Sequence, residues 1–280
     1  FFVVSVAKCH AVFFVIAIAR RNGPGEEELI NALVNNVTNL TLLIGLPALI
    51  WGLQLKPQGK PAKKVMRGFR LSRLSLALTL VALLVFTGIT WALGIDGELS
   101  VSDGLALIAL FLFWQLVEVF NVLRTNVETG RKLSPKLILD LGGIAAGAVL
   151  MFVTIEGLTA WISAIKTGFI SYQNVGWLSG WLTVLPNAVP AFYYAATKRA
   201  DVVYSSQLGD GHICIPFCIG LGAILSPTPV PMLFSVGMLL TAALGIMHLG
   251  VVTLTGRAGR IIGTVLVVIY ALFVYGGLLA

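Results

Sequence analysis

Polar side chains that could bind a cation lie inside two apolar segments of this sequence. In residues 31–52, the carboxamides of Asn31, Asn35 and Asn39 recur every four residues, so a helix would align them along one face. Hydrocarbon cannot pair the donor and acceptor of a carboxamide, so such groups usually face a partner helix, a cavity or a ligand. The stripe therefore indicates either hydrogen bonding between helices or a site of neutral oxygen ligands.

The second segment, residues 202–225, also has a polar first half and an apolar second half. When the two segments are aligned without gaps so that Gly45 falls on Gly220, Asn35 falls on Asp210. This shared layout is typical of a duplicated transporter, whose two halves keep weak internal symmetry. Asp210 adds a carboxylate to the second polar half, and acids inside a membrane are functional candidates.

The composition is that of a polytopic membrane protein. Hydrophobic residues make up 58% of the 280 residues and charged residues 11%, against about 25% charged in a typical soluble domain. Nine apolar segments are each near the length of ~20 residues that a spanning helix needs. They are residues 1–19, 29–53, 74–94, 104–123, 137–163, 171–196, 202–225, 230–254 and 261–280. The net charge of +7 is explained by basic loops and not by nucleic-acid binding.

The distribution of charge over the loops predicts how the segments cross the membrane. Residues 54–73 carry seven Lys and Arg and no acid, which marks this loop as cytoplasmic, whereas residues 94–103 carry three acids and no base. Alternation then places the C-terminus outside. The two polar segments lie five helices apart and run in opposite directions, as inverted repeats require. Ten helices would be needed, so we expect the first helix of the first repeat to be missing before Phe1.

Helix-breaking residues surround a third polar position. Pro186 and Pro190 flank Asn187, and each removes a backbone hydrogen bond, which would leave carbonyl oxygens free to bind a cation. A kink that serves only helix packing is the alternative.

Two further kinds of chemistry can be considered for the second polar segment. Asp210, Cys214 and Cys218 share a helical face and could hold a soft metal such as zinc or manganese, although thiols in apolar helices are usually inert packing. An intramembrane enzyme would need a nucleophile and a base at a usable spacing, which Ser205 and His212 do not supply. We therefore expect that the protein is not an enzyme and has no resident cofactor.

The polar motifs resemble those of the calcium:cation antiporter superfamily, which comprises the sodium/calcium exchangers and their bacterial relatives. That family carries a Gly-Thr-Ser-Leu-Pro-Glu-type motif on the second helix of each repeat and a Gly-Ser-Asn-x-x-Asn-type motif on the third. Here TVLPN at 183–187 is similar to the first motif, and VNNVTN at 34–39 and GDGHIC at 209–214 are similar to the second.

The resemblance implies an all-α polytopic membrane protein with about nine transmembrane helices in two inverted-topology repeats of four and five helices. Residues 1–124 would form the first exchanger repeat, 125–136 a cytoplasmic linker and 137–280 the second exchanger repeat. It also implies an integral membrane protein of a bacterial inner (cell) membrane. Its partners would be membrane lipid and small inorganic cations, with no nucleic acid, and no protein partner is indicated.

The chain departs from the family pattern at the residues that chelate calcium. The two central glutamates of the family fall here on Val12 and Asn187, and Asp210 replaces a serine ligand. Lys8, which precedes Val12 by one helical turn, could place an ammonium where a cation would bind. Calcium prefers six to eight oxygens with several carboxylates, so one carboxylate among carboxamides suits a monovalent cation or a proton better.

The resemblance therefore implies a secondary active cation antiporter with weakened calcium ligands, which would exchange calcium for sodium or protons by alternating access. The alternative is a non-transporting membrane subunit of a larger complex that keeps the exchanger fold. The expected cation ligands are Asp210, Asn187, Asn35, Asn39, Thr183, Ser206 and Gln207. Asp210, Asn187 and Asn39 are the expected contacts to a metal ion, and Asp210 is the expected coupling acid.

Overall fold

The computed structural model describes residues 9–19, 25–56, 63–129, 136–165 and 168–279, and nearly all of them are helical. The α-helices are α2 (Cys9–Ala19), α3 (Glu26–Leu40), α4 (Leu42–Trp51), α5 (Lys63–Leu93), α6 (Val101–Thr129), α7 (Lys136–Ala164), α8 (Val175–Ala196), α9 (Ala200–Ile213), α10 (Ile219–Leu225), α11 (Met232–Gly250) and α12 (Arg260–Leu279). A 3-10 turn, η1 (Tyr172–Asn174), precedes α8, and π-helical turns, η2 (Cys214–Cys218) and η3 (Val251–Thr255), follow α9 and α11. The strands are β1 (Leu53–Gln54), β2 (Glu98–Leu99), β3 (Thr228–Pro229) and β4 (Arg257–Ala258).

Seven helical spans in the described part of the chain are long and apolar enough to cross a membrane. The polar segments form two of them, Glu26–Trp51 from α3 and α4, and Ala200–Leu225 from α9, η2 and α10. Two of the nine segments expected from sequence do not meet this measure. The described part of the first is α2, whose 11 residues extend about 17 Å, short of a bilayer core of about 30 Å. The segment 171–196 becomes the 22-residue helix α8, whose prolines and polar side chains reduce its hydropathy.

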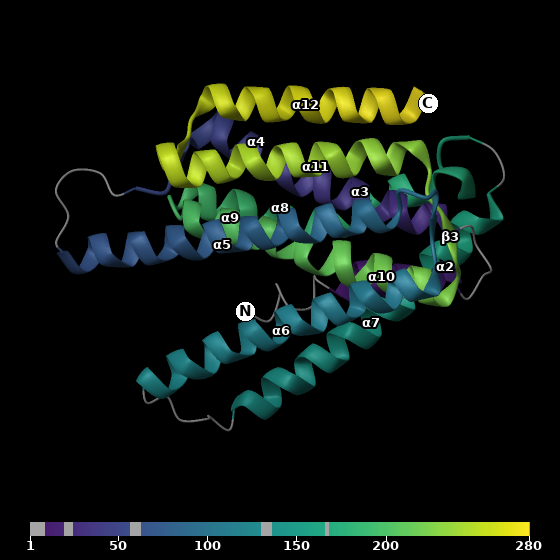
Figure 1. Ribbon diagram of the computed structural model, residues 1–280, viewed down its shortest axis with the longest axis horizontal. Coiled ribbons are helices and arrows are strands. Elements are labelled where there is room, and N and C mark those ends of the chain that lie inside the picture. The colour runs from purple at the N-terminus through teal and green to yellow at the C-terminus, as the bar shows by residue number, and fades with distance from the viewer. Residues whose placement is uncertain (1–8, 20–24, 57–62, 130–135, 166–167, 280) are drawn as a thin grey trace.

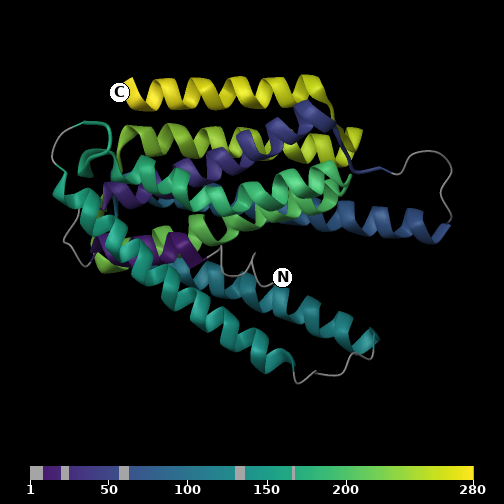
Figure 2. The ribbon, with the colours of Figure 1, turned by 180° about the vertical axis from the view of Figure 1, so that it is seen from behind.

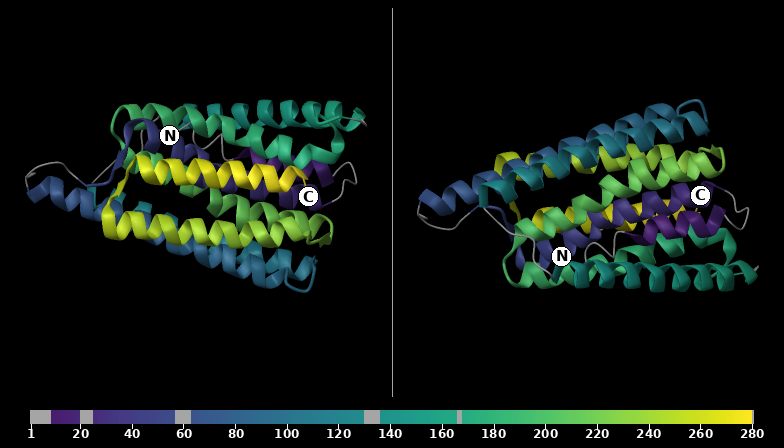
Figure 3. Two further views of the ribbon diagram at one scale, coloured as in Figure 1. Left: turned by 90° about the horizontal axis from the view of Figure 1, so that it is seen from above. Right: turned by 90° about the horizontal axis from the view of Figure 1, so that it is seen from below.

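The helices form a bundle in which α12 lies on one side and α6 and α7 on the other (Figures 1 and 2). Seen from above and below, α5 and α6 lie along one flank of the bundle and α7 and α8 along the opposite flank (Figure 3). The polar segments α3 and α9 lie between these flanks, where most of their residues are buried. The outer helices instead expose large apolar side chains, as lipid-facing helices do.

Two short antiparallel strand pairs join the two halves of the chain at opposite ends of the bundle. β1 pairs with β4, opposing Leu53 to Ala258, and β2 pairs with β3, opposing Leu99 to Thr228. The internal alignment that places Gly45 on Gly220 also places β1 on β3, which is one strand of each pair. We call the end that holds β1 and β4 the basic end and the end that holds β2 and β3 the acidic end.

Glycines at two helix crossings repeat the same symmetry. Gly45 of α4 faces α12, and a Cβ on it would lie 2.9 Å from the Cβ of Leu266. Gly220 of α10, its partner in the internal alignment, faces α6, and a Cβ on it would lie 2.9 Å from the Cβ of Leu107. The same close approach therefore occurs twice, each time between a helix of one half and a helix of the other. The inverted-repeat fold expected from the sequence is confirmed, whereas the exact repeat boundaries stay a prediction.

Alanine at the partner glycines of these crossings should destabilise the protein. A Cβ on Gly104 would lie 2.6 Å from the Gly220 carbonyl oxygen, and a Cβ on Gly263 would lie 2.5 Å from the Leu49 nitrogen. Because both neighbours are backbone atoms, each Gly→Ala change should cost about 1–3 kcal/mol of unfolding free energy. Thermal unfolding in detergent measures this. Gly88→Ala is the control, since nothing lies within 4 Å of its Cβ position, and equal melting temperatures in all three variants would contradict the expectation.

Candidate functional site

The asparagine stripe of α3 faces α8 along a ladder of hydrogen bonds. Asn31 Nδ2 donates to Ser179 Oγ at 2.7 Å, and Asn35 Nδ2 donates to Thr183 Oγ1 at 2.9 Å. Both pairs are separated by 148 residues, so the two helices run parallel and their side chains meet once per turn. The stripe predicted from the sequence is therefore a helix contact over its first two members.

The ladder continues at both ends. Toward the acidic end, Glu27 Oε2 accepts a hydrogen bond from the Gly176 backbone N–H at 2.6 Å. Toward the middle of the bundle, Asn187 Nδ2 lies 3.4 Å from Asn39 Oδ1, again at a separation of 148 residues. Glu27 was not predicted, although it precedes Asn31 by four residues and so extends the same spacing.

Asp210 lies at the inner end of this ladder and is 4% exposed. Its Oδ2 accepts hydrogen bonds from Asn39 Nδ2 at 2.9 Å and from Asn187 Nδ2 at 2.7 Å. The two donors come from α3 and α8, while Asp210 itself is on α9. One carboxylate oxygen thus joins a helix of the first half to two helices of the second half.

The carboxamides around Asp210 are linked to one another and to a thiol. Asn39 Nδ2 also lies 2.8 Å from Asn35 Oδ1, and the Cys214 thiol donates to the same Oδ1 at 3.6 Å. Cys214 and Cys218 pack with Val15 of α2. Val12, on which a family glutamate falls, packs against this cluster as well, so an apolar side chain lies beside the site there. Lys8 lies outside the described residues.

The remaining predicted ligands are placed differently. Gln207 Nε2 donates to the Asn187 carbonyl oxygen at 3.4 Å and to Ser206 Oγ at 2.9 Å. Ser206 Oγ donates to the Val203 carbonyl oxygen of its own helix. Five predicted residues therefore form one network, Asn35, Asn39, Thr183, Asn187 and Asp210, while Gln207 reaches it through the backbone of α8 and Ser206 only through Gln207.

Pro186 and Pro190 lie inside α8, and His212 of α9 packs against α5 and α6. α8 continues as one helix through Pro186 and Pro190, so whether their neighbouring carbonyls bind a cation stays a prediction. His212 Nε2 lies 2.8 Å from the Thr79 carbonyl oxygen, and its ring packs edge to face against Phe86 and Trp114. His212 therefore faces α5 and α6.

The residues named for the two other kinds of chemistry have the following contacts. Ser205 Oγ donates to the Val202 carbonyl oxygen of its own helix, apart from His212. Within the ranges that the structure describes, no group of three or more His, Cys, Asp and Glu side chains is placed to hold a metal ion. Cys214 and Cys218 pack with Val15 of α2, and the Cys214 thiol also donates to Asn35 Oδ1.

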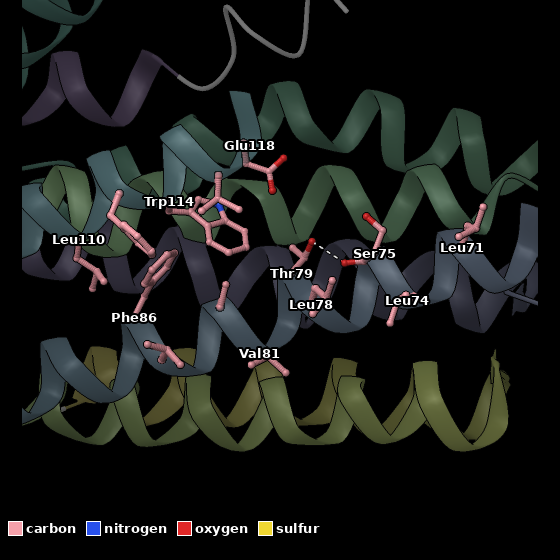
Figure 4. Close-up of a pocket in the computed structure, with 14 residues that line it drawn as sticks. Leu71, Leu74, Ser75, Leu78, Thr79, Val81, Phe86, Leu110, Trp114 and Glu118 are labelled. Carbon is pink, nitrogen blue, oxygen red and sulfur yellow. Dashed lines mark hydrogen bonds between the residues drawn. The ribbon is translucent and has the colours of Figure 1, made fainter. Parts of the chain in front are cut away.

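One groove lies between α5 and α6, and one cavity reaches the ladder. A groove of about 800 Å³ between α5 and α6 is lined mainly by apolar residues, with Glu118, Ser75 and Thr79 among them (Figure 4). None of the five network residues lines this groove. A smaller cavity of about 200 Å³ between α2, α7 and α8 reaches the outer surface of the ladder at Ser179 and Thr183.

Two inverted halves that meet at a buried polar centre define the architecture of a secondary transporter. The family model described as sodium/calcium exchanger protein matches residues 139–278, which is half of the chain. The chain belongs to the sodium/calcium exchanger family, as the resemblance of its motifs implied, and it is an integral membrane protein of the cation antiporter type.

Solved structures of the sodium–calcium exchanger NCX_Mj share the fold. The structure soaked with zero Na⁺ and Ca²⁺ has a TM-score of 0.65 and 19% sequence identity, over 98% of this chain and 86% of that chain. The structure soaked with 2.5 mM Na⁺ and 10 mM Sr²⁺ has a TM-score of 0.66 and 18% identity, over 98% of this chain and 84% of that chain. At this identity the likeness shows the fold alone. A comparison with curated proteins found no match.

Removing the Asn39 carboxamide should destabilise the protein more than removing the Asn36 carboxamide. Asn39→Ala takes a donor from both Asp210 and Asn35, and unpaired buried polar groups cost about 1–3 kcal/mol. Asn36→Ala is the matched control, because the Asn36 amide donates within its own helix to the Ala32 carbonyl. Unfolding in detergent should show the larger loss for Asn39→Ala, and equal losses would contradict the network.

Proposed function

We propose that this protein is a secondary cation antiporter that exchanges calcium for sodium or protons by alternating access at Asp210. The observation that supports this proposal best is the position of that carboxylate. It is buried at the centre of the bundle, and its two amide donors, Asn39 and Asn187, come from the two inverted halves. Rocking one half against the other would therefore change which end of the bundle reaches Asp210.

The ligand set explains why calcium would bind weakly. Calcium takes six to eight oxygens and gains much of its affinity from carboxylates. The network offers the Asp210 carboxylate, the carboxamides of Asn35, Asn39 and Asn187, and the Thr183 hydroxyl. Because Asn39 and Asn187 direct their N–H groups at Asp210, each amide would have to turn its oxygen inward to bind a cation.

Competition for one carboxylate would couple the exchange. Calcium, sodium and a proton would each have to be compensated by the same Asp210 carboxylate, so two of them bound together would leave extra positive charge unpaired in a buried site. The amide donors stabilise the ionised form of the empty site and would be released when a cation arrives. One cation must then leave before the other binds, and coupled exchange follows provided that the empty site does not change its access between the two sides of the membrane.

Calcium uptake into proteoliposomes tests the proposal. We expect uptake of isotopic calcium driven by an outward sodium or proton gradient, reduced to the background of empty liposomes by Asp210→Asn, which keeps the shape of the side chain but removes its charge. Asp201→Asn should transport normally, because Asp201 pairs with Arg199 at 3.3 Å on the surface of the same helix. Absence of uptake by folded protein under both gradients would favour a non-transporting subunit or another cation.

A further inference from the structure

Three buried side chains near the site have polar atoms for which the described residues provide no hydrogen-bond partner. These atoms are Tyr204 Oη, Gln207 Oε1 and His248 Nδ1. The three residues are 0%, 1% and 0% exposed. A buried polar atom without a partner costs free energy, and such atoms are rare enough in folded proteins that each one needs an explanation.

All three side chains lie between Asp210 and the basic end of the bundle. α9 begins at Ala200, directly after Lys198 and Arg199, and reaches Tyr204 and Gln207 before Asp210. His248 is in the last turn of α11, at the same end. The rings of Tyr204 and His248 meet edge to face with centroids 5.5 Å apart, and Gln207 follows Tyr204 by one helical turn.

The partnered atoms of two of these side chains hold the backbone beside the site. His248 Nε2 lies 2.8 Å from the carbonyl oxygen of Leu40, the residue that follows Asn39. Because a carbonyl can only accept, Nε2 carries the proton and Nδ1 presents a lone pair. Gln207 Nε2 donates to the carbonyl oxygen of Asn187, so its Oε1 is likewise an acceptor.

The rungs of the ladder on the acidic side of Asp210 are paired directly, although Ser171 Oγ and Trp181 Nε1, toward the same end, are also buried without a hydrogen-bond partner in the described part of the chain. There the ladder between α3 and α8 pairs Asn35 with Thr183, Asn31 with Ser179, and Glu27 with a backbone N–H. Each of these rungs satisfies its members by direct contact. Toward the basic end, the acceptors Gln207 Oε1 and His248 Nδ1 and the Tyr204 hydroxyl are available to bind a small molecule such as water.

We infer that Tyr204, Gln207 and His248 form a hydrated polar station that binds water and passes the transported cation between Asp210 and the basic end. Water suits this station, because buried water typically makes about three hydrogen bonds to otherwise unsatisfied polar groups. Tyr204 can donate or accept, while Gln207 Oε1 and His248 Nδ1 accept a hydrogen from water or contact a cation directly. The role in passage rests on the proposed antiport, whereas the hydration does not.

The stability of Tyr204→Phe distinguishes a hydrated station from a dry one. If water binds the hydroxyl, its removal breaks a hydrogen bond and should lower the melting temperature by about 2–4 °C in a chain of this size. If the hydroxyl is dry, its removal relieves an unpaired polar group, so the melting temperature should stay the same or rise. Tyr275→Phe is the control, because Tyr275 is exposed on α12. An unchanged or raised melting temperature for Tyr204→Phe would overturn the hydration.

Thiol labelling tests the station without depending on transport. In a background with the three native cysteines replaced by alanine, Gln207→Cys should react with a small charged methanethiosulfonate reagent added at the basic end. Its rate should exceed that of Val203→Cys by at least about tenfold, since a hydrated site admits the reagent during local opening. Val203 lies on the same helix, is 0% exposed against 1% for Gln207, and has no polar side chain. Equal rates would therefore overturn the station.

The two tests together separate this inference from the antiport itself. A Gln207→Cys variant that labels rapidly in a protein without gradient-driven uptake would keep the hydrated station and remove its role in passage. Normal antiport with no difference between Gln207→Cys and Val203→Cys would keep the antiporter and place its inner passage elsewhere.

Discussion

The need to bind one buried carboxylate governs how the centre of this protein is packed. Within a membrane, an ionised acid must be surrounded by donors or cations, because the cost of leaving it unpaired exceeds that of most other defects. Asp210 receives its two amide donors from Asn39 and Asn187. α3, α8 and α9 are therefore held to a common point, and the ladder between α3 and α8 fixes their register. The closely packed glycine crossings of α4 and α10 bring the second halves of the same spans against α12 and α6.

The site also illustrates how an exchanger scaffold tolerates a different charge distribution. The motif resemblance places the two family glutamates on Val12 and Asn187 and a serine ligand on Asp210, so it implies that the negative charge lies on a different helix in this chain. In this chain the carboxylate is on α9, and the amide of Asn187, on the proline-containing α8, is one of its hydrogen-bond donors.

Patterns that repeat in the sequence predicted most of the fold and part of the site. The four-residue spacing of Asn31, Asn35 and Asn39 and the internal alignment of Gly45 with Gly220 are linear signals, and both correspond to contacts in the structure. Tyr204 and His248 carry no such signal, because their contact joins α9 to α11 and no spacing within either helix indicates it. Ser206 shows the opposite limit, since its proximity in sequence to Asp210 does not decide which way its hydroxyl turns.

The strand pairs have a consequence for how the protein is made. Leu53 pairs with Ala258, and Leu99 pairs with Thr228, so each half closes its loops only with strands of the other half. A ribosome delivers the first half to the membrane well before those strands exist. The helices of the first half are therefore inserted before β3, β4 and Asp210 have been synthesised, so β1, β2 and Asn39 have no partners from the second half at that stage. Assembly is completed only as the last two spans are inserted.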